Sequence, residues 1–238
     1  MRRYLLIGAL AFLALLVWRL PASWVAALLP GALRCADASG SLWNGRCGTL
    51  RAQGLELQGV SWQLAALPLL TGTAEIQLQV DDARVAASAR VRARTGGAWR
   101  AEHVSLRLPL EHPQLHLGPP GYRGNIVADL AEISGHGATV AMASGTVQLL
   151  QLRSSAELGS YEVRLGPAAD GDGITGELRD LEGPLQVDGQ LRLRPHGYEL
   201  QGHALPRNPP GEPLAKALDM LGPPDADGRR PFSVEGTF

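Results

Sequence analysis

Between residues 74 and 202 the chain repeatedly alternates apolar and polar residues with a period of two. Such a segment buries one face and exposes the other, as antiparallel β-strands do. Gly and Pro, which end strands at turns, are plentiful at 29 and 17 residues. The sequence therefore predicts a mainly β protein, an antiparallel meander that forms either one curved sheet or a sandwich. The clearest strands are residues 74–80, 85–93, 104–108, 125–130, 146–152 and 161–165.

Two further elements are predicted near the C-terminus. Residues 189–202 predict a β-hairpin, because two alternating segments flank a three-residue connection that ends in Gly197. Residues 213–221 predict one short C-terminal helix, since Pro213 lies in its first turn and Gly222 follows its last turn.

The N-terminal end contains the only long apolar run of the chain, residues 4–18, with Arg2 and Arg3 before it and Arg19 after it. A fifteen-residue helix is about 22 Å long, shorter than the roughly 30 Å hydrocarbon core, but Arg19 can extend its charge to the interface. The positive-inside rule keeps the first arginines in the cytoplasm. We therefore expect one uncleaved transmembrane signal anchor, with the body of the protein outside the cytoplasm. The alternative is a cleaved signal peptide, whose apolar region has a similar length.

This topology divides the chain into three parts. Residues 1–20 would form the cytoplasmic stub and membrane anchor, residues 21–34 a juxtamembrane segment, and residues 35–238 the β domain.

The β domain begins at the only two cysteines, Cys35 and Cys47, which enclose eleven residues. Disulfides persist in oxidising compartments, so a body outside the cytoplasm favours a bridge between them. Gly40 and Gly45 allow a turn that would bring two flanking strands, and hence both sulfurs, together. A closed loop of this size stabilises a fold by about 3 kcal/mol. The alternative is two unpaired buried thiols; a catalytic cysteine would need a nearby His or a Cys-x-x-Cys motif, and neither is present.

The sequence predicts no catalytic, cofactor-binding or metal-binding residue, and so no enzyme. The motifs Gly-x-Ser-x-Gly, Gly-x-x-x-x-Gly-Lys-Ser/Thr and His-Glu-x-x-His are absent. Residues 170–173 and 225–228 begin like calcium loops but lack the later oxygen ligands, so we interpret them as turns. A net charge of −1 without a basic cluster argues against nucleic acid as a partner.

Two tryptophans stand at the start of the β domain, Trp43 between the cysteines and Trp62 within Val-Ser-Trp-Gln-Leu. Either could pack between strands in the core or serve as an anchor on a binding surface.

Residues 40–46, Gly-Ser-Leu-Trp-Asn-Gly-Arg, resemble the Gly-Thr-Leu-Trp-x-Gly-x segment of the type II secretion system protein N family. In that family the segment also follows a single N-terminal membrane segment. The stretch around Trp62 is similar to a second Trp-centred stretch of the family, and the C-terminal helix, turn and last strand match in outline. Ser41 stands where the family usually has Thr. The motif residues, which the resemblance marks as a possible interface, are Gly40, Leu42, Trp43, Gly45 and Trp62.

The resemblance implies a single-pass protein of the bacterial inner membrane with a periplasmic β domain. It would be a non-enzymatic accessory part of the inner-membrane assembly platform of type II secretion, which exports folded proteins across the outer membrane. The implied partners are other inner-membrane platform proteins, with the outer-membrane secretin as a further candidate. A β domain could bind them through an unpaired strand edge, by main-chain hydrogen bonds.

The competing class is a membrane-anchored periplasmic protein that binds or transfers lipid. A long meander can curl into a groove whose apolar face shields acyl chains. An uncovered apolar face would favour lipid handling, whereas a face sealed by a second layer would favour an interaction module. The residues that decide between them are Ile76, Leu78, Val91, Leu106, Leu191 and Leu193.

Overall fold

The computed structural model describes residues 4, 8, 16, 19–23, 33–52, 55–111, 121–168, 173–194 and 196–237. In this part of the chain thirteen strands form one antiparallel sheet, and their order in the sheet is their order in the sequence. The strands are β1 (Leu33–Gly40), β2 (Asn44–Ala52), β3 (Leu55–Ala65), β4 (Thr73–Asp81), β5 (Ala86–Arg94), β6 (Ala98–Pro109), β7 (Arg123–His136), β8 (Thr139–Arg153), β9 (Glu157–Pro167), β10 (Ile174–Glu182), β11 (Leu185–Arg194), β12 (Gly197–Pro206) and β13 (Arg230–Thr237).

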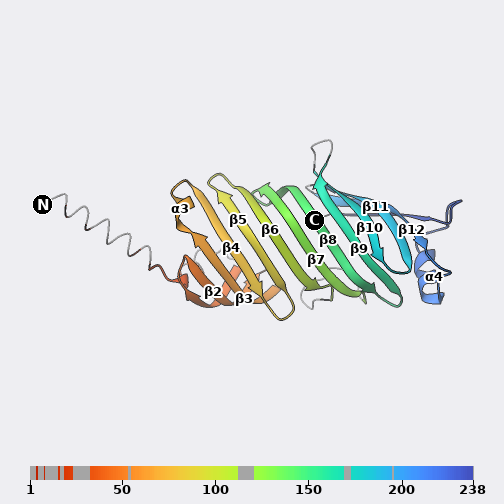
Figure 1. Cartoon of the computed structure of the whole chain (residues 1–238), viewed down its shortest axis with the longest axis horizontal. Coiled ribbons are helices and arrows are strands. Elements are labelled where there is room, and N and C mark those ends of the chain that lie inside the picture. The colour runs from red at the N-terminus through yellow and green to blue at the C-terminus, as the bar shows by residue number, and fades with distance from the viewer. Residues whose placement is uncertain are drawn as a thin grey trace.

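Two short helices interrupt the meander. Helix α3 (Ala66–Leu69) connects β3 to β4, and α4 (Glu212–Asp219) lies between β12 and β13. Figure 1 shows an elongated, twisted sheet with β2 and β3 near one end and α4 at the other.

The predicted β class, the long meander and the late helix are confirmed, and the choice between a sheet and a sandwich resolves as one sheet. Each strand contacts mainly its neighbours in sequence, and no second sheet of described residues lies against it. The predicted anchor, residues 4–18, falls almost entirely outside the described residues. Among those that are described, no helix has both the length and the apolar character needed to cross a membrane.

The middle strands are longer than the alternation predicts, because bulges change its phase. Strand β6 has 12 residues, and the prediction covered only 104–108. Within it His103 has a φ of 52°, and the register between β5 and β6 shifts by one residue at this point. The extra residue keeps Ala101 and Val104 on one face although they are three positions apart.

One face of the sheet is apolar across all thirteen strands. Directly opposed residues of antiparallel strands point to the same side of a sheet, so the register identifies a row that runs from β1 to β13. No member of the row is charged or carries a polar side chain, and we call it the apolar lane. Its members are Ala38, Cys47, Val60, Val80, Ala87, Leu106, Ala128, Val147, Val163, Leu178, Gly189, Gly202 and Phe232.

The opposite face carries charged side chains that pair with one another. Arg92 Nε donates to Glu75 Oε2 at 3.2 Å, and Arg92 Nη1 donates to Glu102 Oε1 at 3.2 Å. Arg100 and Glu132 form a further pair at 3.1 Å. Partly exposed pairs of this kind add little stability, but their charges remain hydrated, which suits a face in contact with water. The sheet therefore has one charged face and one apolar face.

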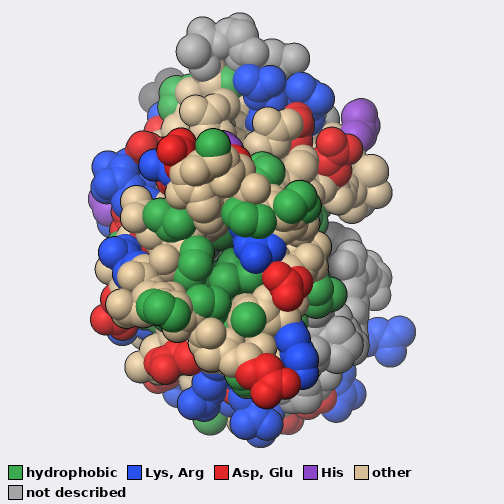
Figure 2. All heavy atoms as spheres, turned by 90° about the vertical axis from the view of Figure 1, so that its right-hand side faces the viewer, with side chains coloured by type: hydrophobic (Ala, Val, Ile, Leu, Met, Phe, Trp, Pro, Cys, Tyr) green, Lys and Arg blue, Asp and Glu red, His purple; other side chains and the backbone are tan. Residues whose placement is uncertain are grey.

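A compact hydrophobic cluster lies at the α4 end of the apolar face. Leu214 and Leu218 of α4 are 8% and 3% exposed, and they join Leu178, Leu185, Val187 and Ala204 of the sheet. Figure 2 looks along the long axis at this end and shows hydrophobic side chains gathered in the middle of the view, with most charged side chains around them. Helix α4 therefore covers the C-terminal end of the apolar lane, to which Leu178 belongs.

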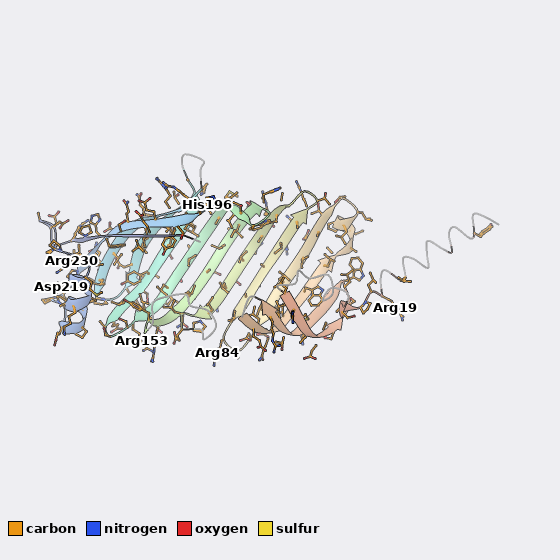
Figure 3. The ribbon with its side chains drawn as sticks, turned by 180° about the vertical axis from the view of Figure 1, so that it is seen from behind. Arg19, Arg84, Arg153, His196, Asp219 and Arg230 are labelled. Atoms are coloured by element: carbon orange, nitrogen blue, oxygen red, sulfur yellow. A yellow bond between two sulfur atoms is a disulfide. The ribbon has the colours of Figure 1, made fainter. Side chains whose placement is uncertain are left out.

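Arg230 fixes the end of α4. Its Nη1 donates to Leu218 O at 3.1 Å, and its Nη2 donates to Asp219 Oδ1 at 3.1 Å, the two labelled side chains lying close together in Figure 3. The first bond adds a donor to a carbonyl of the last helical turn, and the second is an ion pair with the final helical residue.

Candidate interaction site

The turn between β1 and β2 is stabilised by its own residues. Ser41 N donates to Asn44 O at 2.9 Å, and Asn44 N donates to Ser41 Oγ at 3.1 Å. Gly40 has a φ of 88°, a left-handed conformation that strains any residue with a side chain, and a Cβ there would lie 2.5 Å from Asn44 O. The first Gly of the family motif is therefore required by the turn.

Trp62 lies at the base of this turn. Its indole Nε1 donates to Leu42 O at 3.0 Å, and its ring occupies the space that Gly45, opposite it in β2, leaves open. A Cβ at Gly45 would lie 2.3 Å from a ring carbon of Trp62. Of the two predicted roles, the packing role fits Trp62, and it links Trp62 to Leu42 and Gly45, which lie about twenty residues earlier in the sequence.

Trp43 lies in the turn itself and is half-buried. Its carbonyl oxygen accepts a hydrogen bond from Leu64 N at 2.7 Å, so the backbone of the turn is attached to β3. Like Leu42 and Trp62, Trp43 is only partly buried, so a partner could contact it.

A disulfide closes the same hairpin. Cys35 and Cys47 are joined with their Cα atoms 5.7 Å apart, and Cys47 is only 1% exposed. The bond therefore lies at the N-terminal edge of the sheet, where no strand of described residues pairs with the outer side of β1.

The residues before β1 attach to the Trp43 turn as well. Leu42 N donates to Leu20 O at 2.9 Å, and Pro21 forms an isolated antiparallel bridge with Ser41. Ala22 is 1% exposed. The sequence did not indicate this contact, since neither segment has a helical or alternating pattern. The turn thus connects the sheet to the segment that directly follows the predicted anchor.

The six residues that distinguish the two function classes all lie on the apolar face. Leu106 belongs to the lane, and each of the other five is an even number of positions from the lane member of its own strand, as Ile76 and Leu78 are from Val80. Leu78 is 38% exposed, and the other five are partly exposed. No second sheet of described residues covers them.

No cluster suited to a metal ion is found among the described residues. They contain no group of three or more His, Cys, Asp or Glu that could hold a metal ion. Residues 225–228 form the predicted turn, with Asp225 Oδ1 accepting hydrogen bonds from Asp227 N at 3.0 Å and Arg229 N at 2.8 Å. Residues 170–172 lie outside the described part. A hollow of about 620 Å³ over β10–β12 is lined by mixed charges and has no His, Cys or Lys in its wall.

Comparison with known proteins gives one consistent result. Residues 31–233 match the family described as "Type II secretion system (T2SS), protein N". A similar protein, "Type II secretion system protein N" of Aeromonas hydrophila, is 27% identical over 261 residues, an alignment that covers 99% of each chain. No solved structure matches the chain.

Proposed function

The chain belongs to the type II secretion system protein N family and is a component of type II protein secretion; from this we propose that it is a non-enzymatic accessory part of the inner-membrane platform. The observation that carries the proposal is the family match over nearly the whole β body, which includes the Trp43 turn. Its partners would be other platform proteins, with the outer-membrane secretin as a further candidate.

The proposed topology is a single-pass inner-membrane protein whose β domain is periplasmic. Residues 1–20 would be the stub and anchor, residues 21–34 the juxtamembrane segment and residues 35–238 the periplasmic domain. The disulfide supports an oxidising location, because such bonds do not persist in the cytoplasm. A C-terminal alkaline phosphatase fusion tests this topology, since the reporter is active only in the periplasm. An inactive fusion of normal abundance would contradict it.

The proposed contact site is the turn formed by Gly40, Leu42, Trp43 and Gly45, supported by Trp62. A photoreactive residue at position 43, in membranes that contain the native neighbours, should capture a platform protein or the secretin. Position 99 is the matched control, because Trp99 is also half-buried and its Nε1 is bonded to Gly137 O at 3.0 Å, far along the sheet. Equal capture from both positions, or capture from neither, would contradict the assignment of the interface.

Strand addition is a second proposed contact mode, and it depends on the open edges β1 and β13. In β13 only Pro231 interrupts the row of main-chain donors, so residues 232–237 can pair with an extended segment of a partner. Val234 is 45% exposed, and Val234→Lys places a charge on this edge. The variant should reduce co-isolation of the partner, whereas Gln201→Lys in the neighbouring β12 should not. Unchanged co-isolation with Val234→Lys would exclude the β13 edge.

Lipid handling is the second candidate function, and the uncovered apolar face favours it. The six deciding residues remain partly exposed on that face, the outcome that an open groove requires. The two functions are compatible within one secretion machine. The test is to purify the full chain from membranes and to measure the lipid that accompanies it. Bound lipid that is lost when lane residues are replaced by charged ones would support this candidate.

A further inference from the structure

We infer that the apolar lane is a binding site for the acyl chains of membrane lipids, loaded from the β1–β3 end of the sheet and closed at its other end by α4. The inference rests on the second candidate function and specifies its ligand, its path and its direction. It is carried by a register in which all thirteen strands contribute one apolar residue to a single row.

The chemistry of the lane selects a ligand without hydrogen-bonding groups. The faces of a sheet offer no free main-chain N–H or C=O, because the strands use those groups between themselves. The lane side chains offer none either. An extended polypeptide on this face would leave its own backbone groups unpaired, at a cost of several kcal/mol for each buried group. An acyl chain has no such groups and gains from every part of its surface removed from water.

The lane is long, and small residues stand at several of its positions. Twelve strand spacings give a length of about 58 Å, about twice the thickness of a bilayer's hydrocarbon core. Ala87 and Ala128 stand on either side of Leu106 in the middle of the row, and Gly189 and Gly202 stand near its end. Ala87 and Ala128 leave space above the backbone for a chain of methylene groups, whereas the ring of Phe232 already lies above Gly202, 2.8 Å from where its Cβ would be.

The loading end is the one that adjoins the membrane in the proposed topology. The Trp43 turn holds residues 20–22, and Arg19 lies at this end of the sheet in Figure 3. Between residues 19 and 52 the chain has four arginines and one aspartate, whereas residues 212–237 have five acidic and three basic residues. A basic end suits the anionic surface of a membrane, and an acidic end does not.

The far end of the lane is already occupied by the protein itself. Leu214 and Leu218 of α4 lie in one cluster with Leu178 of the lane, and Phe232 packs against that cluster. Part of the α4 backbone is bonded within the helix, so α4 can lie on an apolar face with a smaller penalty than an extended strand would incur. A lipid entering at β1–β3 would therefore stop where α4 begins.

The test uses the full chain in vesicles of phosphatidylethanolamine and phosphatidylglycerol, with a photoreactive residue at single positions. Val80, Leu106 and Val147 sample the lane, while Gln79 and Arg107 are next to lane members but point to the charged face. After illumination, mass spectrometry of the intact protein should show lipid adducts several-fold more abundant at the lane positions than at the controls. Equal adducts on both faces, or none in the lane, would overturn the inference.

Direction is tested by blocking the lane midway. Leu106→Asp places a charge between Val80 and Val147, so adducts should persist at position 80 and fall several-fold at position 147. Ser105→Asp, on the opposite face of the same strand, is the control and should change neither. If Leu106→Asp does not fold, Ala87→Asp blocks the neighbouring strand. Undiminished adducts at position 147 in a folded blocked variant would overturn loading from the β1–β3 end.

Secretion measured in cells separates this inference from the proposed functions. If deletion of the protein impairs export but the vesicles give no lane adducts, the platform role stands and the lipid site fails. The opposite outcome is that lipid adducts form in the lane and that Leu106→Asp removes the adducts at position 147 while export is unchanged. In that case the lipid site stands and its role in secretion fails.

Discussion

The most informative single change is Leu218→Ala in α4, because it tests whether the sheet unfolds as one unit. Leu218 is 3% exposed and lies in the cluster that holds α4 on the apolar face. Truncation of a buried Leu to Ala costs about 2–5 kcal/mol, and a loss of about 3 kcal/mol is expected at this well-packed site. Since 1.4 kcal/mol is a factor of ten, local opening should become roughly a hundredfold more frequent.

The loss should remain local. Each strand contacts mainly its neighbours in sequence, and interactions in such linear arrays pass from one unit to the next. Amide hydrogen exchange of the full chain, followed by mass spectrometry, should therefore show lost protection in α4, β12 and β13. Protection in β4–β7 should stay as it is in the wild type.

The control is Met220→Ala, two residues after Leu218, at a side chain that is 87% exposed. A change at such a surface position should alter stability by less than about 0.5 kcal/mol. Equal loss of protection in β4–β7 and α4 would refute the local description of the sheet. If the two variants exchange alike, the Leu218 contacts do not hold α4 in place.

Three further predictions concern the two ends of the sheet. Replacing Cys35 and Cys47 together by Ser should lower the free energy of unfolding by about 3 kcal/mol, measured by urea titration. An unchanged urea midpoint would show that the loop between the two cysteines is already ordered without the disulfide. Trp62→Phe removes the hydrogen bond to Leu42 O but keeps an aromatic ring, so it should cost about 1 kcal/mol by the same measurement; no loss would mean that ring packing alone holds the turn. Burial, with a smaller contribution from a nearby carboxylate, raises the pKa of Tyr161 from 10.0 to about 12, so the folded state keeps this proton longer than the unfolded state. Stability should be unaffected by this group below pH 10 and should fall by up to about 2 kcal/mol between pH 10 and 12, whereas Tyr161→Phe should lack that decrease.

The alternation of the sequence predicts the strands well, but it does not predict how far they extend. Where the pattern stays in phase, as in residues 74–80, the predicted segment and β4 nearly coincide. Strand β8 has 15 residues, and the predicted segment 146–152 covers less than half of it, because Gly145 adopts a φ of 137° at a point where the pairing shifts. A bulge of this kind depends on the partner strand, so the pattern of one segment does not reveal it.

The candidate site could be predicted only as a list of residues. The motif identified Gly40, Gly45 and Trp62, but the contact of the indole with Gly45 depends on the pairing of β2 with β3, which local sequence does not specify. The apolar lane escaped prediction for the same reason. Its members are ordinary apolar positions within their own strands, and only the register of all twelve strand pairs places them in one row. Helix α3 was also missed, since four residues that include Pro68 carry no helical period.

The sequential order of the strands has a consequence for how the protein is made. During synthesis β1 and β2 are made before the later strands, and their pairing with each other needs nothing that follows. Each later strand then meets an edge that is already formed, so the sheet can grow as fast as the chain emerges. No strand has to wait for a distant partner, the situation that slows folding and exposes unpaired edges to aggregation. The same order lets a hairpin be added to or removed from the middle during evolution without disturbing the two ends.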